Sequence, residues 1–350
     1  MALARRPLLA GAGAALLAAL SFGATAPVIA LCSQRVRPVS IACLLYAGAA
    51  ASSLLPRRGA ATKGAPFGRA EAWRVLGMAL MGGAVAPSLL AWGLQRTGAT
   101  AGSLLLNLEA SFTVLLAWLV YREPLGSRVT AALGLMTLGG AALAFDFIGG
   151  APWHLVGALA VAAATLCWAI DNTLSRGLTQ QDPVLVVALK STLAALATAT
   201  TARALGEPLP PARDALVLLA CGASGYGLSL RLYLRAQRRI GAARTASIFA
   251  VAPFMGAAIG LSLGDRARPE LALAGGLFLA GLWLHLTERH RHHHVHAPLE
   301  HEHPHRHDDG HHDHVHDPAF SGEHSHAHRH ERLEHDHEHT PDLHHDHTHS

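Results

Sequence analysis

The stretch QRTGATAGSLLLNLEASF, residues 95–112, has a relative later in the chain, QRRIGAARTASIFAVAPF, residues 237–254. With one inserted residue allowed, both begin with Gln-Arg, reach a Gly-Ala pair and continue into a run of small and apolar residues. A second pair matches in the same way: LLAALSFGATAP at 16–27 and AAATLCWAIDNT at 162–173. These pairs predict a chain of two related halves, each built from segments apolar enough to cross a membrane.

The composition also indicates a membrane protein. The 350 residues are 51% hydrophobic, and the mean hydropathy is +0.26. The segment 290–350 holds 24 of the 26 histidines and 13 of the 24 acidic residues, and the rest of the chain has only two lysines, Lys63 and Lys190. A soluble domain of that length would carry many more surface charges. The chain is therefore predicted to be a polytopic membrane protein with a polar tail, whose partner is a lipid bilayer and not a nucleic acid.

Apolar runs bounded by Gly, Pro and Arg predict ten membrane-spanning helices. Each run has roughly the 17 to 24 residues that a helix needs to cross the hydrocarbon core. The first run also fits a signal peptide, because it lies between Arg5-Arg6 and Ala24-Thr25-Ala26. It is longer than the usual signal core and has a partner in the second half, so we expect an uncleaved helix. The ten spans are 8–31, 38–55, 73–94, 100–121, 128–148, 153–175, 183–205, 214–234, 242–263 and 271–287.

The basic residues predict the orientation. Ten spans place both termini on one side of the membrane. The loops on that side hold 15 Lys and Arg residues and the loops on the other side hold 7. Cytoplasmic loops carry the excess of positive charge, so both termini and the tail are expected in the cytoplasm of a bacterial-type inner membrane.

Five spans per half is an odd number, so the second half must cross the membrane in the opposite sense. Inverted repeats of this kind are typical of secondary transporters, which bind their solute near the midplane between the halves. The expected fold class is an all-α membrane protein of two inverted five-helix repeats. The repeats are expected at 8–148 and 153–287, followed by a disordered His-rich tail at 288–350.

On these motifs the chain resembles EamA-type members of the drug/metabolite transporter superfamily over residues 8–287. The features that carry the resemblance are GATAP, the small-residue helix after QRTGA, the exit YREPL with Glu123, and RRIGAARTASIFAVAPF with the acidic exit residue Asp265. One position departs from the family pattern. Such transporters often have a proline-containing helix in the first copy, where this chain has Asn107-Leu108-Glu109, while the second copy keeps Pro253. The resemblance implies a transporter but no particular solute.

Glu109 is the leading candidate for chemistry, because an acid inside a membrane helix is costly unless it is paired, protonated or hydrated. Burial favours the neutral carboxyl, which can release its proton when water or a cation enters, as a proton-coupled carrier requires. A protonated Glu109 that only hydrogen-bonds a neighbouring helix is the structural alternative. Asn107, two residues away, is also a candidate but points to a different face of the helix.

Asp171 and Lys190 form a second candidate pair. They lie on consecutive predicted helices at similar distances from the connecting turn, so an ion pair between them fits the geometry, and pairing makes two buried charges tolerable. They either order the two helices or form a gate or substrate site, together with Asn172. Trp168 lies deep enough to pack on an organic substrate or simply in the core.

Other features weigh against alternative classes. Cys32, Cys43, Cys167 and Cys221 are isolated and read as packing residues. The chain has no GxSxG, Walker or HExxH motif and no soluble segment long enough for a nucleotide-binding domain, so we expect no enzyme and no required cofactor. The GxxxG motif at 256–260 more often marks internal packing than dimerisation, and a homodimer is left open.

The tail has the composition of a metal-binding segment. Its units repeat as HHDHVH (311–316), HDHEH (335–339) and HHDHTH (344–349). Neutral imidazole binds Zn²⁺, Ni²⁺ and Co²⁺, and unstructured sites of this kind are several and poorly selective. Low-complexity expansion without a role is the alternative. The candidate ligands are His311, His312, His314, His316, His335, His337, His339, His344, His345, His347 and His349.

Three functions follow. The first is a proton-coupled carrier of a small metabolite or drug-like solute, with the tail as a metal buffer or sensor. The second is a divalent-metal exporter, in which the tail collects ions and Glu109 with Asp171 carries them across. A metal sensor that transports nothing is the third, and it leaves the inverted repeat without a purpose.

Overall fold

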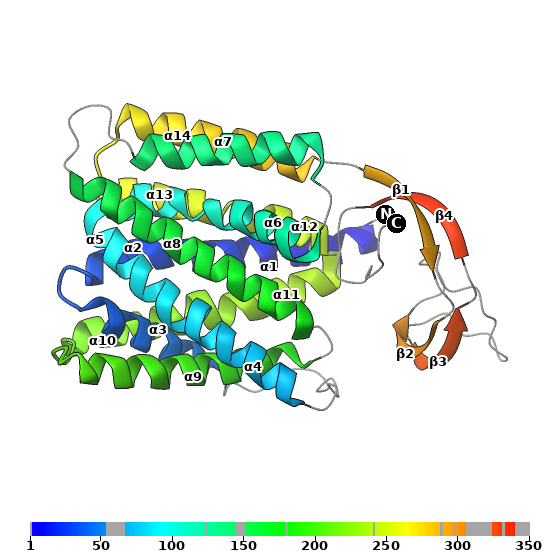
Figure 1. The fold of residues 1–350 in the computed structure, drawn as a ribbon, viewed down its shortest axis with the longest axis horizontal. Helices are drawn as coiled ribbons and strands as arrows, with labels where there is room; N and C mark the ends of the chain where they lie inside the picture. Colours follow the sequence, from blue (N-terminus) through cyan, green and yellow to red (C-terminus); the bar gives the residue numbers. More distant parts are fainter. Residues whose placement is uncertain are drawn as a thin grey trace. The chain divides into compact units, whose positions relative to one another are not determined.

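The computed structural model describes residues 2–53, 67–122, 125–144, 152–178, 181–240, 242–287, 290–296, 299–305, 324–330 and 333–339 (Figure 1). Its contacts divide the chain into two units, residues 1–287 and 288–350. The predicted exit residue Glu123 lies outside the described residues. The first unit is a helical bundle, as the sequence predicts.

The first half of the bundle runs from α1 to α7. Its elements are α1 (Ala2–Gly23), α2 (Thr25–Cys32), α3 (Pro38–Ser53), α4 (Arg69–Met78), the π-helical segment η1 (Ala79–Val85), α5 (Ala86–Leu105), α6 (Leu108–Tyr121) and α7 (Ser127–Ala144). The second half consists of α8 (Pro152–Ser175), the short 3₁₀ helix η2 (Arg176–Leu178), α9 (Pro183–Ala204), α10 (Ala212–Cys221), the π-helical segment η3 (Gly222–Leu228), α11 (Ser229–Ile240), α12 (Ala242–Phe249), α13 (Ala252–Ser262) and α14 (Pro269–Leu286).

The described helices are consistent with most of the expected spans. Eight are long and apolar enough to cross a membrane, and two shorter apolar helices, α3 and α6, accompany them. The expected span at 100–121 is built from two pieces. Gly98 interrupts α5 with a φ of 78°, and residues 99–105 then lead into α6 after a break at Leu106–Asn107.

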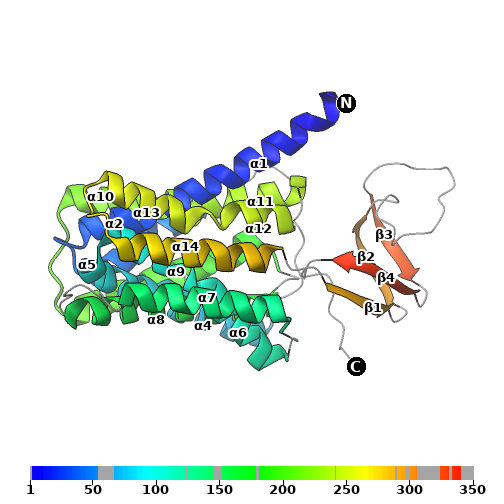
Figure 2. The same cartoon turned by 90° about the horizontal axis from the view of Figure 1, so that it is seen from above.

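The two halves interlock, and each packs mainly on the other. α8 packs on α5 and α6 of the first half, and correspondingly α1 packs on α11, α12 and α13 of the second. α3 packs on α9 and η3, and α7 packs along α14, as Figure 2 also shows. Small residues allow these close contacts: a methyl group on Gly256 would meet the carbonyl oxygen of Gly23 at 2.6 Å. The GxxxG motif thus serves internal packing, as expected.

Two irregularities occur at matching places in the halves. α4 and α10 have 10 residues each, and each is followed by a π-helical segment of 7 residues. The fourth and ninth spans are both broken, at 106–107 and at 250–251. Glu109 and Pro253 are each the second residue of the helix that follows the break. The acid that departs from the family pattern thus stands where the second copy has its proline.

In the second unit the structure describes four strands. β1 (His290–His296) pairs antiparallel with β4 (Leu333–His339), and β2 (Leu299–His305) pairs antiparallel with β3 (His324–His330). The disorder predicted for residues 288–350 stays a prediction. The alternation of His with other residues in these four stretches has the period of two that a strand requires.

Candidate functional site

The π-helical segment η1 contributes backbone contacts to the candidate site. A π turn is wider than an α turn, and such segments occur often at functional sites. In η1 the carbonyl oxygen of Gly82 accepts two side-chain hydrogen bonds, from the hydroxyl of Tyr46 at 2.6 Å and from the indole Nε1 of Trp168 at 3.0 Å. Both bonds are buried. They tie α3 and α8 to the middle of the third span.

Asp171 and Lys190 form the ion pair that their spacing predicts. The Lys190 ammonium donates to Asp171 Oδ2, and both side chains are largely buried, with 14% and 8% of the Lys and Asp side chains exposed. Asp171 lies directly against Gly82, where any side chain at position 82 would collide with its carboxylate. The second carboxylate oxygen, Oδ1, is buried and has no hydrogen-bond partner in the described part of the chain.

Glu109 is held by Asn172, the residue after Asp171. The Asn172 amide donates to Glu109 Oε1 at 2.9 Å and lies 3.5 Å from the hydroxyl oxygen of Thr113. Glu109 is half-buried, whereas Asn172 is exposed. Glu109 lies in the first turn of α6, where the helix dipole favours an anion. A hydrogen bond between the two halves therefore ends on a carboxylate at a helix break.

The two contacts share helix α8. Asp171 faces the buried side and Asn172 reaches the accessible side, so one helix of the second half touches both η1 and α6 of the first. Asp171 and Asn172 are consecutive residues of α8, so the ion pair and the contact with Glu109 are adjacent along this helix. Two carboxylates with a single ammonium can bind one further cation or proton. This is the chemistry that the arrangement offers.

Sequence reasoning missed the tyrosines of the site. Tyr46 packs against Tyr226 of η3 with tilted rings whose centroids are 5.6 Å apart, and Tyr226 packs edge-on against Phe22 at 5.9 Å. The hydroxyl of Tyr226 is buried without a hydrogen-bond partner among the described residues. The only available signal was a glycine-rich stretch in the middle of an apolar span, repeated in both halves as MGGA and SGYG.

The remaining predicted residues have varied positions. Asn107 is buried and donates to the carbonyl of Leu104 at 2.9 Å. Its side chain therefore hydrogen-bonds the backbone at the helix break and is not part of the Glu109 contact. Trp168 is buried against Gly82, and its contact with a solute stays a prediction.

Of the predicted metal ligands, three lie on β4, and the others lie outside the described residues. Among described side chains, no three His, Cys, Asp or Glu residues are grouped to hold a metal ion.

Comparison with known proteins agrees with the fold. Residues 9–145 and 155–287 each match the EamA-like transporter family. An uncharacterized transporter of Methanothermobacter thermautotrophicus is 30% identical over 190 residues, which are 51% of this chain and 54% of that protein. The match thus spans about half the length of the relative. A solved crystal structure shares the fold, with a TM-score of 0.53 at 20% identity over 78% of this chain and 95% of the other.

Proposed function

Because the chain belongs to the EamA-like transporter family, we propose that it is a proton-coupled secondary transporter of a small metabolite or drug-like solute. Ten spans, eight long and two short, form two inverted repeats in this proposal, with both termini in the cytoplasm of a bacterial-type inner membrane. Glu109 is the group that binds and releases the proton. The observation that carries the proposal is the hydrogen bond between Glu109 of the first repeat and Asn172 of the second.

The position of Glu109 supports a role in coupling. In an inverted repeat the two halves move against each other around a fixed site. A contact that joins the halves must change when they move. The amide of Asn172 can donate to a charged or a neutral carboxyl, but it binds the charged form more strongly. Protonation of Glu109 therefore weakens the link, and proton binding is coupled to the separation of the halves.

The Asp171–Lys190 pair supports the same site. The Oδ1 atom of Asp171 is buried and has no hydrogen-bond partner among the described residues, so it offers an acceptor to a solute. Unpaired buried acceptors are costly. A solute that donates a hydrogen bond there would be recognised without breaking the ion pair. In this proposal Asp171, Lys190 and Asn172 position the solute, and Glu109 supplies the proton.

The experiment first needs a solute. Growth of a strain lacking the protein across a panel of metabolite analogues and a panel of metals identifies candidates. Purified protein in liposomes is then tested for uptake of those candidates driven by an imposed pH gradient. Glu109→Gln keeps the size and the acceptor for Asn172 but cannot bind a proton. We expect at least a hundredfold loss of gradient-driven uptake, while exchange of solute without net proton movement survives.

Glu109→Asp serves as the matched control, because it retains an acid at the same helix position. Partial gradient-driven uptake is expected for this variant. Full proton-driven uptake by Glu109→Gln would show that the carboxylate is structural, and the coupling role would then pass to Asp171.

A divalent-metal exporter is the second candidate, and the tail favours it. In the tail, every β4 position that carries a predicted metal ligand pairs with a histidine of β1: His335 with His294, His337 with His292, and His339 with His290. Imidazole is a ligand for Zn²⁺, Ni²⁺ and Co²⁺, and the strand pairing brings histidines from two parts of the tail to opposite positions. Within the bundle, however, Lys190 already balances Asp171. Metal tolerance in the growth panel that falls with Glu109→Gln would favour the exporter.

A further inference from the structure

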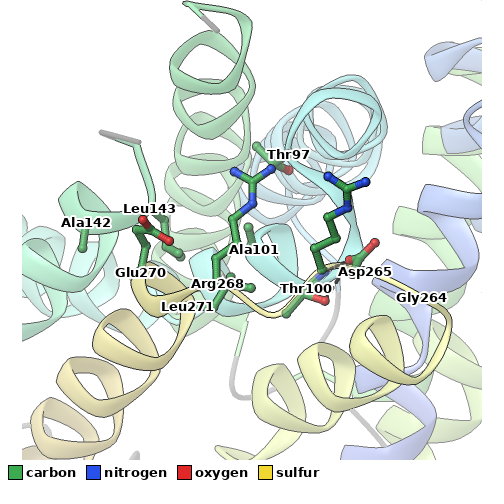
Figure 3. A pocket seen from close by; sticks show the side chains of 11 residues that line it. Thr97, Thr100, Ala101, Ala142, Leu143, Gly264, Asp265, Arg268, Glu270 and Leu271 are labelled. Atoms are coloured by element: carbon green, nitrogen blue, oxygen red, sulfur yellow. Dashed lines mark hydrogen bonds between the residues drawn. The ribbon is translucent and has the colours of Figure 1, made fainter. Parts of the chain in front are cut away.

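The bundle has a pocket of about 310 Å³ away from the Glu109 site (Figure 3). It lies at the end of the bundle where the loop between α13 and α14 passes the interruption of α5. Its lining includes Thr97, Thr100, Ala142, Leu143 and Leu271 together with four charged residues, Asp265, Arg266, Arg268 and Glu270. A volume of this size is at the lower end of the range for small-molecule sites. Both signs of charge are therefore present in one small cavity.

One carboxylate of the pocket is already engaged. Asp265 Oδ2 accepts hydrogen bonds from the backbone N–H of Thr100 at 2.7 Å and from its hydroxyl at 2.8 Å. These bonds cap the helical piece that restarts after Gly98. Asp265, the expected acidic exit residue, thus has a structural role. It fixes the wall of the pocket and leaves the other carboxylate to act on a ligand.

That other carboxylate is Glu270. It lies in the first turn of α14, where the helix dipole stabilises its charged form. Its Oε2 atom is buried and has no hydrogen-bond partner in the part of the chain that the structure describes. A buried, charged oxygen without a donor is costly. An ammonium group is the donor that suits it, with both charge and N–H bonds.

Two arginines of the pocket carry the charge opposite to that of Glu270. Arg266 and Arg268 line the same pocket, and in Figure 3 Arg268 stands between Glu270 and Asp265. Guanidinium groups bind planar or tetrahedral anions through paired N–H donors. An anion alone would face the charge of Glu270, and a cation alone would face the arginines. A ligand with both groups avoids either repulsion.

We propose that this pocket binds a dipolar ligand, whose carboxylate or phosphate lies at Arg266 and whose primary ammonium lies at Glu270. Two sources share this chemistry: a free zwitterionic solute, and the headgroup of an aminophospholipid, since the pocket lies at an end of the bundle where headgroups are found. The apolar wall from α7 and α14 suits the stem of either molecule. The site does not depend on the proton chemistry of Glu109.

The test measures binding to the full-length protein in detergent, by calorimetry and by the shift of the thermal unfolding midpoint. The soluble probes are leucine and glycerophosphoethanolamine, and the half-probes are acetate, ethylammonium and glycerol phosphate. We expect at least one dipolar probe to bind and to raise the midpoint, and to bind at least tenfold more tightly than any half-probe. Protection by added phosphatidylethanolamine, and none by phosphatidylglycerol, identifies the lipid source, whereas protection by leucine identifies the solute source.

Two variants test the assignment of each charge. Glu270→Gln removes the acceptor charge, and Arg266→Gln removes an exposed donor whose loss leaves the packing intact. Each should weaken binding of the dipolar probe at least tenfold. Arg213→Gln, an exposed arginine in α10 that does not line the pocket, should leave binding unchanged. Equal binding by Arg266→Gln and the parent protein, or binding of acetate as tight as that of leucine, would overturn the proposal, as would no binding by any dipolar probe.

Discussion

At the scale of single residues, the charge of Asp171 is balanced by Lys190 on the next helix. Moving an isolated charge into the membrane is expensive, and a pair recovers most of that cost only when the two groups touch. Asp171 and Lys190 meet this condition because Gly82 has no side chain in the way. Asn172 then reaches Glu109. The chemistry proposed for the site thus depends on four side chains and on the glycine at position 82, which leaves room for them.

The pair predicts a clear pattern in a double-mutant cycle. Asp171→Asn or Lys190→Met alone leaves an uncompensated buried charge and should lower the free energy of unfolding by about 3–5 kcal/mol. The double variant removes both charges and should be more stable than either single variant. Unfolding in detergent by heat or denaturant measures all four proteins. Additive losses in the double variant would contradict a direct ion pair.

At the scale of elements, the two repeats share their irregularities. The π-helical segments begin after 10 helical residues in both halves, and both broken spans restart within two residues. Backbone groups freed inside a membrane need partners. The Gly82 carbonyl accepts hydrogen bonds from Tyr46 and Trp168. At the first helix break the Asn107 side chain donates to the carbonyl of Leu104. Irregular backbone therefore lies where the two halves meet, as transporter sites require.

Gly82→Ala tests the π-helical segment η1 of the site. The added methyl group would collide with the Asp171 carboxylate and push α8 away from η1. We expect a loss of about 1–3 kcal/mol of stability, as for other overpacked positions, and a loss of transport. Gly276→Ala in α14 is the matched control, because a methyl group there meets nothing within 4 Å. Equal behaviour of the two variants in unfolding and transport assays would show that η1 tolerates a side chain.

At the scale of the whole molecule, the first unit is built from halves that complete each other. α1 packs on α11 to α13, and α8 packs on α5 and α6, so neither half holds its own core. Arg35 and Asp214 add a bidentate ion pair between the halves, at 2.8 and 3.0 Å. The hydrogen bond to the Asp214 carboxylate raises the pKa of Arg35, because it favours the charged guanidinium. The two halves are therefore expected to fold together.

The proposed inverted repeat predicts the topology. With ten crossings and the basic loops inside, reporter fusions after Arg58 and after Ser350 should be active in the cytoplasm. A fusion after Pro210 should be active on the other side. Paired reporters, one active on each side, measure all three positions. A Ser350 fusion that is active outside would contradict the count of spans.

The tail predicts a separable metal site. Truncation after Glu288 removes no membrane span, so the protein should insert and fold while losing its high-capacity binding of Ni²⁺ or Zn²⁺. Because only neutral imidazole binds metal, the binding of the full-length chain should fall steeply below about pH 6. Equilibrium dialysis of the full-length and truncated proteins at several pH values measures the loss of metal binding on truncation and its dependence on pH. Equal metal binding by the truncated protein would exclude the tail as the source of ligands.

A finer comparison tests the paired strands. Replacing His335, His337 and His339 with Gln removes three residues that pair with histidines of β1. Replacing His311, His312 and His314 removes the same number elsewhere in the tail. If paired strands form the sites, the first variant loses more of the bound metal. Equal losses would favour many interchangeable sites along the tail.

The sequence by itself determined the class of the protein. Apolar runs of membrane length, the two related stretches at 95–112 and 237–254, and the basic loops indicate a helical transporter with inverted repeats, because hydrophobic length and repetition are local properties of a chain. The spacing of Asp171 and Lys190 also predicted their contact, since the two residues lie at similar distances from the turn that connects their helices. These inferences need no knowledge of distant packing.

Only the tertiary structure decided which groups form the candidate site. Asn172 meets Glu109 across 63 residues, and Tyr46 and Trp168 meet at the carbonyl of Gly82 from two other helices. The pocket near Asp265 is lined by α5 and α7 of the first half and by α14 and the loop before it in the second half. None of these contacts has a periodic signal, because each depends on how helices rotate and approach one another. Glycines allow two helices to approach closely, and which groups come into contact there depends on the residues that lie next to the glycine in the folded structure.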